Sequence, residues 1–246
     1  MSIPYLFICR HQVDKNMIYI KDADDVRHLR SSLRARPGDE VYLSDNDLFK
    51  YRTVLKEIGS ESAVLEIREK EDLKRILPGI TLYQCILKKN AMEFVIQKTT
   101  EIGISRIIPV MSSRVIPDIH GNNIRIQRWQ KISDEASKQS KRDFKCLIGK
   151  PVKIEDIDVS SYGYFLFPHE RASRGPADMV GILSRLTEAG EIAYLIGPEG
   201  GLTSGEAGLI KKKGALETGL GDNIFRAETA ALYTLSVIDF YIKSSK

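Results

Sequence analysis

The sequence of 246 residues holds few of the side chains that form disulfides or bind structural metals. Its three cysteines, Cys9, Cys85 and Cys146, are odd in number and scattered along the chain. The four histidines form no pair at a metal-ligand spacing. We therefore expect reduced thiols, buried by default, and no metal site.

Long apolar runs are missing as well. No apolar stretch reaches the length that spans a bilayer, and the start, MSIPYLFICRHQ, lacks the charged beginning and long apolar segment of a secretory signal. The sequence therefore predicts a soluble cytoplasmic protein. Its formal charge of +4 suits an acidic partner without identifying one.

The familiar phosphate-binding motifs are also absent. The chain has neither the Lys-Ser/Thr pair of a P-loop nor the G-x-G-x-x-G pattern of a dinucleotide site. This absence counts against a nucleotide-dependent enzyme of the ordinary α/β type, which is one of three hypotheses considered for this chain.

The first part of the chain is rich in short β-type runs. YLFIC, MIYI, EVYLSD, YRTVLKEI and SAVLEIRE surround one helical pattern, DADDVRHLRSSLR, in which Val26, Leu29 and Leu33 recur at helical spacing. We predict a small β-barrel with one helix over residues 1–72. The charged stretch EKEDLKR, residues 69–75, is interpreted as a linker.

From about residue 80 the pattern alternates between strands and helices. Strands are predicted at 81–87, 106–111, 164–167, 192–197 and near 215–219, with helices at 91–103, 123–142, 177–189, around 207–213 and to the C-terminus. This alternation predicts an α/β domain with a largely parallel sheet over residues 73–246. Trp129 is interpreted as core or interface.

Three loops that follow predicted strands combine glycine or proline with charged residues. They are FPHE, GPEGG and GLGDNIFRAE, and ligands of parallel sheets bind beyond the carboxyl ends of the strands. Thr203 and Glu206 have capping-box spacing for the helix after GPEGG. Glu199 would repel a phosphate and favours a cationic ligand. Arg226 precedes a helix, where the dipole disfavours a cation, and this cost indicates function.

Basic residues gather in two places. One group lies at the first helix and turn, and in the other, residues 121–153, nine Lys or Arg face three acids. A solvated surface is the usual explanation, and contact with RNA phosphates is the alternative. The residues assigned to RNA contact are Arg27, Arg30, Arg34, Arg36, Lys138, Lys141 and Arg142.

LIGPEGGLTSGE followed by LGDNIFRAETAAL resembles the signature pair of the RsmE family of SPOUT-superfamily RNA methyltransferases. The resemblance extends in order to HLRSSLRARPGDEV, QKTTEIGISRIIPV and RWQKISDEASKQSKR, and so covers most of the chain. It implies an N-terminal PUA-like β-barrel, an α/β methyltransferase domain with a trefoil knot, and a homodimer.

The resemblance also implies a methyl donor and an acceptor. The donor is S-adenosyl-L-methionine, and the acceptor is N3 of a uridine in the decoding region of 16S rRNA, within the small ribosomal subunit. The cofactor pocket is expected at the three loops. Its predicted residues are Phe167, Pro168, His169, Leu195, Ile196, Gly197, Pro198, Glu199, Gly200, Gly201, Leu220, Gly221, Ile224, Phe225, Arg226 and Thr229.

The expected chemistry is removal of the N3 proton and stabilisation of the charge that develops. The candidates for orienting the uridine and stabilising its charge are Arg226 and Arg142. The base that removes the proton could be Glu199, Glu228, a phosphate or water. An aromatic side chain, Phe225, stands where the family usually has leucine, which alters the shape of the pocket. The runner-up hypothesis is an RNA-binding protein without catalysis, which would bind RNA but not the cofactor. The apolar C-terminal helix indicates either a buried core helix or a dimer interface.

Overall fold

The computed structural model describes residues 3–74, 78–88, 90–114, 122–170, 172, 181–185 and 190–244, with only the backbone for residues 122–124. By its internal contacts the chain forms two compact units. The N-terminal unit comprises Met1–Arg75 and Lys138–Lys145, and the larger unit comprises Ile76–Ser137 and Cys146–Lys246. The segment from Lys138 to Lys145 is a part of the N-terminal unit that the predicted boundary at 72/73 does not include.

The N-terminal unit is a six-stranded sheet folded around one hydrophobic core. Its strands are β1 (Tyr5–Phe7), β2 (Val13–Asp14), β3 (Met17–Ile20), β4 (Glu40–Ser44), β5 (Phe49–Ile58) and β6 (Ala63–Asp72). They run in the order β1-β4-β5-β6-β3-β2 and are antiparallel except for β1 beside β4. The predicted β-rich unit is confirmed.

One helix covers this core. Asp22 accepts hydrogen bonds from the backbone N–H groups of Asp24 and Asp25 and so starts α1 (Ala23–Arg27), which continues as the π-helical turn η2 (His28–Ser32). Val26 and Leu29 are fully buried in the core. The helix is as predicted. The linker prediction is wrong for residues 69–72, because β6 continues to Asp72, which pairs with Phe49.

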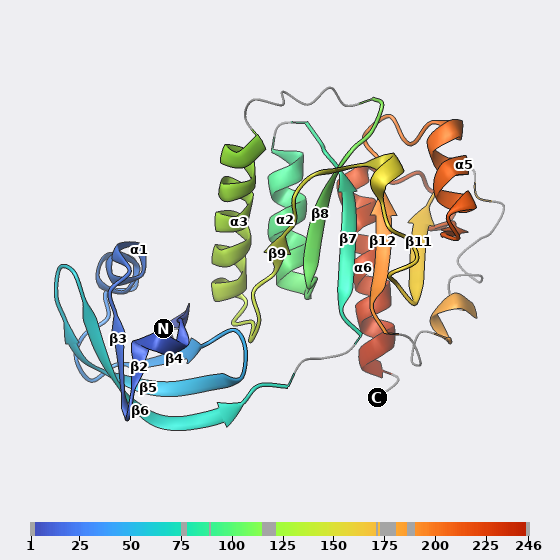
Figure 1. The fold of residues 1–246 in the computed structure, drawn as a ribbon. Helices are drawn as coiled ribbons and strands as arrows, with labels where there is room; N and C mark the ends of the chain where they lie inside the picture. The colour runs from blue at the N-terminus through green and yellow to red at the C-terminus, as the bar shows by residue number, and fades with distance from the viewer. Residues whose placement is uncertain are drawn as a thin grey trace. The chain divides into compact units, whose positions relative to one another are not determined.

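The larger unit is built on a seven-stranded sheet in which every pair is parallel, as predicted (Figure 1). Its strands are β7 (Ile80–Cys85), β8 (Arg106–Met111), β9 (Leu147–Ile148), β10 (Val152–Lys153), β11 (Tyr164–Pro168), β12 (Ile192–Ile196) and β13 (Leu216–Thr218). The order is β10-β8-β7-β12-β11-β13, with β9 also beside β8. The two-residue strands β9 and β10 were not predicted.

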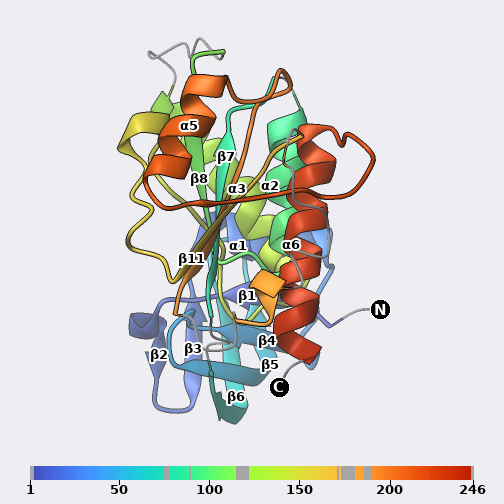
Figure 2. The ribbon, with the colours of Figure 1, turned by 90° about the vertical axis from the view of Figure 1, so that its right-hand side faces the viewer.

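Helices cover both faces of this sheet. The helices whose full bounds lie in the described residues include α2 (Ala91–Ile102), α3 (Asn122–Gln139), α5 (Ser204–Lys212) and α6 (Ala227–Ser244). Figure 2 shows α2 and α6 on one face and α5 on the other. Trp129 of α3 is buried in the same core as α2 and α6, in agreement with its predicted place. The helix predicted at 177–189 lies largely outside the described residues.

The strands alternate their side chains between two cores. Leu166, Tyr194 and Ile196 pack with α2 and α6, whereas Phe167 and Leu195 pack with the residues around α5. Both faces are apolar because both are covered by helices.

The last connection brings the chain back across the sheet. β13 pairs with β11 at one edge, but α6 packs against α2 and β12 nearer the middle. Residues 219–226 therefore cross the carboxyl ends of the strands. The buried hydroxyl of Tyr194 in β12 donates a hydrogen bond of 3.1 Å to the carbonyl of Ala231, which fixes the first turns of α6.

The sequence predicted free thiols, no metal site and no membrane span, and the structure describes the following. Cys9, Cys85 and Cys146 are free thiols, of which the last two are buried. Among the described residues no group of His, Cys, Asp and Glu is arranged to hold a metal ion. Across the same residues, no helix combines the length and apolarity of a membrane span.

Candidate functional site

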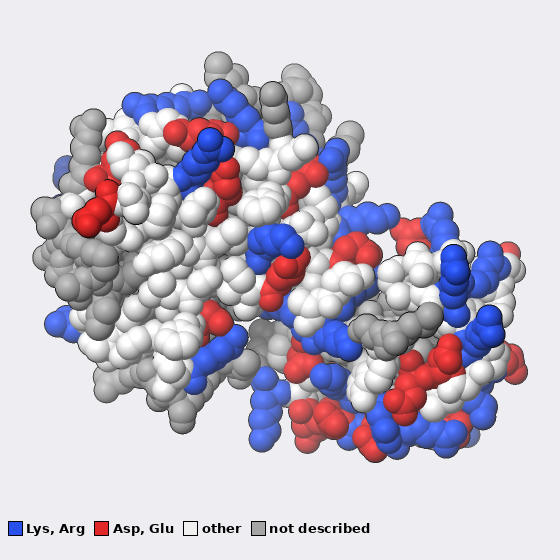
Figure 3. Space-filling model, turned by 180° about the vertical axis from the view of Figure 1, so that it is seen from behind, with Lys and Arg blue, Asp and Glu red and all other residues white. Residues whose placement is uncertain are grey.

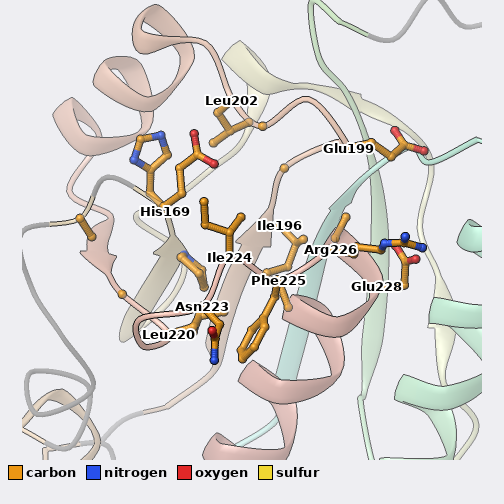
Figure 4. Close-up of a pocket in the computed structure, with 18 of the residues that line it drawn as sticks. His169, Ile196, Glu199, Leu202, Leu220, Asn223, Ile224, Phe225, Arg226 and Glu228 are labelled. Carbon is orange, nitrogen blue, oxygen red and sulfur yellow. The ribbon is translucent and has the colours of Figure 1, made fainter.

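A pocket of about 710 Å³ opens at the carboxyl ends of β11 and β12 (Figure 4). It lies within the larger unit and is built by the three predicted loops together with the start of α6. Its volume is in the range of sites that bind small molecules or cofactors. This position, where strands end and helices begin, is the one expected for a ligand of a parallel sheet.

The first wall follows β11. Pro168, His169 and Glu170 line it, and the backbone N–H of His169 donates to the carbonyl of Thr218 at 3.0 Å, which holds this loop to β13. The His169 Nδ1 lies 3.4 Å from Glu217 Oε1 and forms no hydrogen bond with any described residue.

The second wall is the GPEGG loop. Gly201 has a φ of +68°, which favours glycine, and its N–H donates to the carbonyl of Pro198 at 2.8 Å. A Cβ on Gly197 would lie 3.3 Å from the backbone nitrogen of Leu202, so this position also needs a small residue. Thr203 and Glu206 form the predicted capping box at the start of α5.

Glu199 is tied to a neighbouring strand end. Its Oε1 accepts a hydrogen bond of 2.8 Å from the backbone N–H of Lys88, in the connection between β7 and α2. The carboxylate therefore links two strand-end loops while its charge remains at the rim of the pocket.

The third wall is formed by residues 219–226, which cross the carboxyl ends of the strands between β13 and α6. Phe225 lines the pocket, and its ring lies 5.2 Å from the ring of Tyr233 on α6. Ile224 also lines the pocket and is 78% exposed. Figure 4 shows Arg226, Glu199 and Glu228 on one side of the pocket, opposite His169.

Most of the predicted cofactor residues meet in this pocket. The twelve that line it are Pro168, His169, Ile196, Gly197, Pro198, Glu199, Gly201, Leu220, Gly221, Ile224, Phe225 and Arg226.

Four predicted residues are not among the described residues that line the pocket. Phe167 and Leu195 are fully buried and point toward the α5 core, because neighbouring residues of a strand face opposite sides. Gly200 lies beside the side chain of Arg114. Thr229 is exposed on α6, one position away from the lining residues Glu228 and Ala230.

The pocket also contains residues that were not in the list of predicted cofactor residues, although those at positions 170 and 219–228 belong to the three predicted loops. They are Ala91, Glu170, Ala172, Leu202, Gly219, Asp222, Asn223, Ala227, Glu228 and Ala230. Most are neighbours of predicted residues, and Glu228 was considered only as a base. Ala91 begins α2, far from the three motifs in sequence, and no local signal marks it.

The residues assigned to RNA contact belong to the N-terminal unit, because Lys138, Lys141 and Arg142 lie in its second segment. Arg30, Arg34 and Arg36 are exposed. Arg27 forms an ion pair with Asp24, and Lys138 with Asp25. Arg142 is half-buried and is not among the described residues that line the pocket. On the face in Figure 3 basic and acidic side chains are interspersed.

Two family models match the chain. One, described as an RNA methyltransferase domain, matches residues 75–239, and the other, described as an RNA methyltransferase PUA domain, matches residues 20–68. The first spans more than half of the chain and contains the whole pocket.

Curated relatives match almost the full length. The chain is 26% identical over 250 residues to ribosomal RNA small subunit methyltransferase E of Bacillus subtilis, with 96% of this chain and 95% of that protein covered. The protein of the same name from Rickettsia conorii is 27% identical over 241 residues, with 97% and 96% covered.

A solved structure has the same fold. It is ribosomal RNA small subunit methyltransferase E of Neisseria gonorrhoeae bound to S-adenosyl methionine. It superposes with a TM-score of 0.86 at 25% identity and covers 97% of this chain and 98% of that one.

Proposed function

Because this chain belongs to the RNA methyltransferase family whose model matches residues 75–239, we propose that it methylates N3 of a uridine in small-subunit ribosomal RNA. The methyl donor in this proposal is S-adenosyl-L-methionine. The observation that carries it is the pocket, which joins three strand-end loops, two of them glycine-containing, in a domain of that family.

The lining suits this donor. The cofactor carries a cationic sulfonium and an amino group, and the pocket contains the acidic side chains of Glu199 and Glu228. The apolar walls for an adenine ring are Ile196, Leu202 and Leu220. Backbone N–H and C=O groups of the loops would form hydrogen bonds with the edge of this ring. No lysine occurs among the described lining residues, which agrees with a ligand that has no phosphate.

When bound, the cofactor supplies a methyl group that leaves its sulfur and forms a bond to N3 of the uridine, while the N3 proton is lost. We assign stabilisation of the negative charge on the base to Arg226, which remains protonated and cannot itself take the proton. Glu228 lies on the same side of the pocket in Figure 4 and is the side chain that we assign as proton acceptor, directly or through water. Glu199 contributes negative charge and holds the loop.

RNA binding is assigned to the N-terminal unit, part of which matches the PUA model. Arg30, Arg34 and Arg36 are exposed there and suit phosphate contacts. We assign Arg142, from the second segment of this unit, to the orientation of the target nucleotide. We also propose that the protein acts in the cytoplasm, where a ribosomal substrate is found.

We further propose a homodimer and a knotted chain. Tyr233 and Phe240 are exposed on α6, and Phe94 is exposed on the adjacent helix α2. A second copy that covers this apolar face would remove it from water. The return of residues 219–226 across the sheet is the crossing that we assign to the trefoil knot.

The test is calorimetric titration of S-adenosylmethionine and S-adenosylhomocysteine into the wild type, together with mass spectrometry of ribosomal RNA from small subunits after incubation. Leu220→Trp places a large ring in the pocket, and Leu147→Trp, at an exposed strand position, is its matched control. We expect binding by the wild type and the control only, and a methylated uridine that requires the cofactor. RNA binding without cofactor binding by the wild type would support the non-catalytic hypothesis instead.

A further inference from the structure

The GPEGG loop is held from outside the pocket by the segment that follows β8. The Nη1 group of Arg114 donates a hydrogen bond to the carbonyl of Gly200 and lies 3.4 Å from the carbonyl oxygen of Gly201. Arg114 is exposed and is not among the described residues that line the pocket. Its guanidinium therefore contacts the loop without facing the cofactor site.

Gly200 is the contact point. A Cβ on Gly200 would lie 3.3 Å from Nη1 and 3.5 Å from Cδ of Arg114. Pro198, Glu199 and Gly201 line the pocket, but Gly200 does not. The absence of a side chain at this position lets the guanidinium approach the backbone, and the loop carbonyls are directed toward the cation.

Other hydrogen bonds fix the chain on either side of Gly200 and Gly201. Glu199 accepts from the backbone N–H of Lys88, and Glu206 accepts from the backbone N–H groups of Ser113 and Thr203, each at 2.8 Å. Between these anchors, Gly200 and Gly201 are free of side-chain bulk, and glycine has the greatest backbone freedom. Arg114 supplies the side-chain contact to this flexible middle.

We propose that Arg114 is a positioning residue that holds the Gly200–Gly201 backbone in the conformation that binds the cofactor. The inference rests on the proposed function, because it assigns the cofactor to the GPEGG loop. Nη1 contacts both neighbouring carbonyls, and a lysine ammonium, on a more flexible side chain and more strongly hydrated, would hold them less firmly. The contribution is to cofactor affinity rather than to the methyl-transfer step.

The test compares Arg114→Ala, Arg114→Lys and the matched control Arg106→Ala, which removes an exposed arginine at the opposite end of β8. We expect Arg114→Ala to weaken S-adenosylmethionine binding and raise its KM by about tenfold, as for loss of a charge-assisted hydrogen bond. Arg114→Lys falls between, and kcat with both substrates saturating stays within about twofold. Unchanged cofactor binding in a folded Arg114→Ala variant, or a lower kcat at unchanged KM, overturns the proposal.

A second measurement separates this inference from the proposed function. Amide hydrogen exchange of residues 197–203 in the full-length protein without ligand is expected to be faster in Arg114→Ala and unchanged in Arg106→Ala. Equal exchange in all three proteins refutes the positioning role even if the wild type binds the cofactor. Failure of the wild type to bind cofactor, with faster exchange in Arg114→Ala, refutes the proposed function and keeps the structural role of Arg114.

A mutant cycle tests the contact itself. Gly200→Ala places a methyl group against the guanidinium and is expected to weaken cofactor binding in the wild-type background. In the Arg114→Ala background the same change is expected to have little effect, because its neighbour is gone. Additive effects would show that Gly200 and Arg114 act separately.

Discussion

The ammonium group of Lys138 lies 2.8 Å from Asp25 Oδ1, although 113 residues separate them in the sequence. Their side chains are only 12% and 17% exposed. Close by, the segment is also held through Asp143, whose carbonyl accepts from Ser44 Oγ and whose carboxylate pairs with Lys50. Residues 138–145 are thus built into the N-terminal unit, and the charge of Lys138 is used within the fold.

Lys138→Ala is therefore expected to act on stability. Removal of one partner leaves the largely buried carboxylate of Asp25 uncompensated, at a cost of about 2 kcal/mol. Urea unfolding followed by fluorescence or circular dichroism gives the free energy of unfolding. A variant as stable as the wild type would contradict the role of this pair.

Arg34 and Arg36 are expected to act on RNA affinity instead. Both are exposed, so replacement of either by Ala changes the free energy of unfolding by less than about 0.5 kcal/mol. Each lost phosphate contact reduces the slope of the logarithm of the binding constant against the logarithm of the salt concentration by about one unit. Fluorescence anisotropy with a ribosomal RNA fragment across a salt series measures this slope. An unchanged slope would remove these residues from the RNA surface.

The sequence predicted those parts of the fold that depend on local patterns. The buried apolar run of β12, the helix stop at Gly103 and the Thr203–Glu206 capping box all depend on residues close together in the chain. The strands β9 and β10 could not be predicted this way, because two residues carry no periodicity. Their place is set by pairing with β8.

The candidate site shows the same limit. The three loops were found from their glycine or proline residues and their charges, but the side chains of Phe167 and Leu195, also predicted at the pocket, are buried in the core around α5. Both faces of β11 and β12 are apolar because helices cover both, so the sequence does not reveal which side chains point to which helix layer. The contact of Lys138 with Asp25 depends on distant segments and leaves no local signal.

Glu206 predicts a dependence of stability on acid. Burial raises the pKa of this carboxyl, but hydrogen bonds from Ser113 and Thr203 more than offset that effect and hold the pKa below its ordinary value of 4.5. A group with a lowered folded pKa stabilises the protein above the unfolded value, and this stabilisation is lost as the pH falls through the folded pKa. The stability due to Glu206 should therefore be complete at neutral pH and decline below about 4.5.

The matched variant is Glu206→Gln, which keeps the shape and loses the charge. We expect it to be less stable than the wild type by about 1–3 kcal/mol at neutral pH, with a smaller difference in acid. Urea unfolding at a series of pH values gives both curves. A difference that does not shrink as the pH falls would show that the charge of Glu206 is not the cause.

The exposed face of α6 predicts an effect on oligomeric state. Phe240 is 74% exposed and Tyr233 is 40% exposed, and burial of such rings is a main source of association energy. Phe240→Glu is expected to shift the protein from dimer to monomer in size-exclusion chromatography with light scattering. Leu48→Glu, at an exposed apolar residue of the N-terminal unit, is the control and should leave the mass unchanged. A wild type that is monomeric at all concentrations would refute the interface.

Arg226 separates binding of the cofactor from transfer of the methyl group. Its guanidinium lies at the rim of the pocket on the side of Glu199 and Glu228, where charge would develop on the acceptor base. Loss of a group that stabilises only the transition state lowers kcat and leaves ground-state affinity nearly unchanged. We therefore expect Arg226→Ala to lower kcat by about 100-fold, with the Kd of S-adenosylmethionine within about threefold of the wild type.

The control for Arg226 is the lysine variant. Arg226→Lys keeps the positive charge but loses the planar array of donors. Partial activity is expected if Arg226 acts mainly through its charge, and little activity if it acts mainly by orienting the base. Single-turnover methylation of small ribosomal subunits measures the transfer step apart from product release. An Arg226→Ala variant that transfers methyl groups at the wild-type rate but binds cofactor weakly would reassign Arg226 from the reaction to the binding of the cofactor.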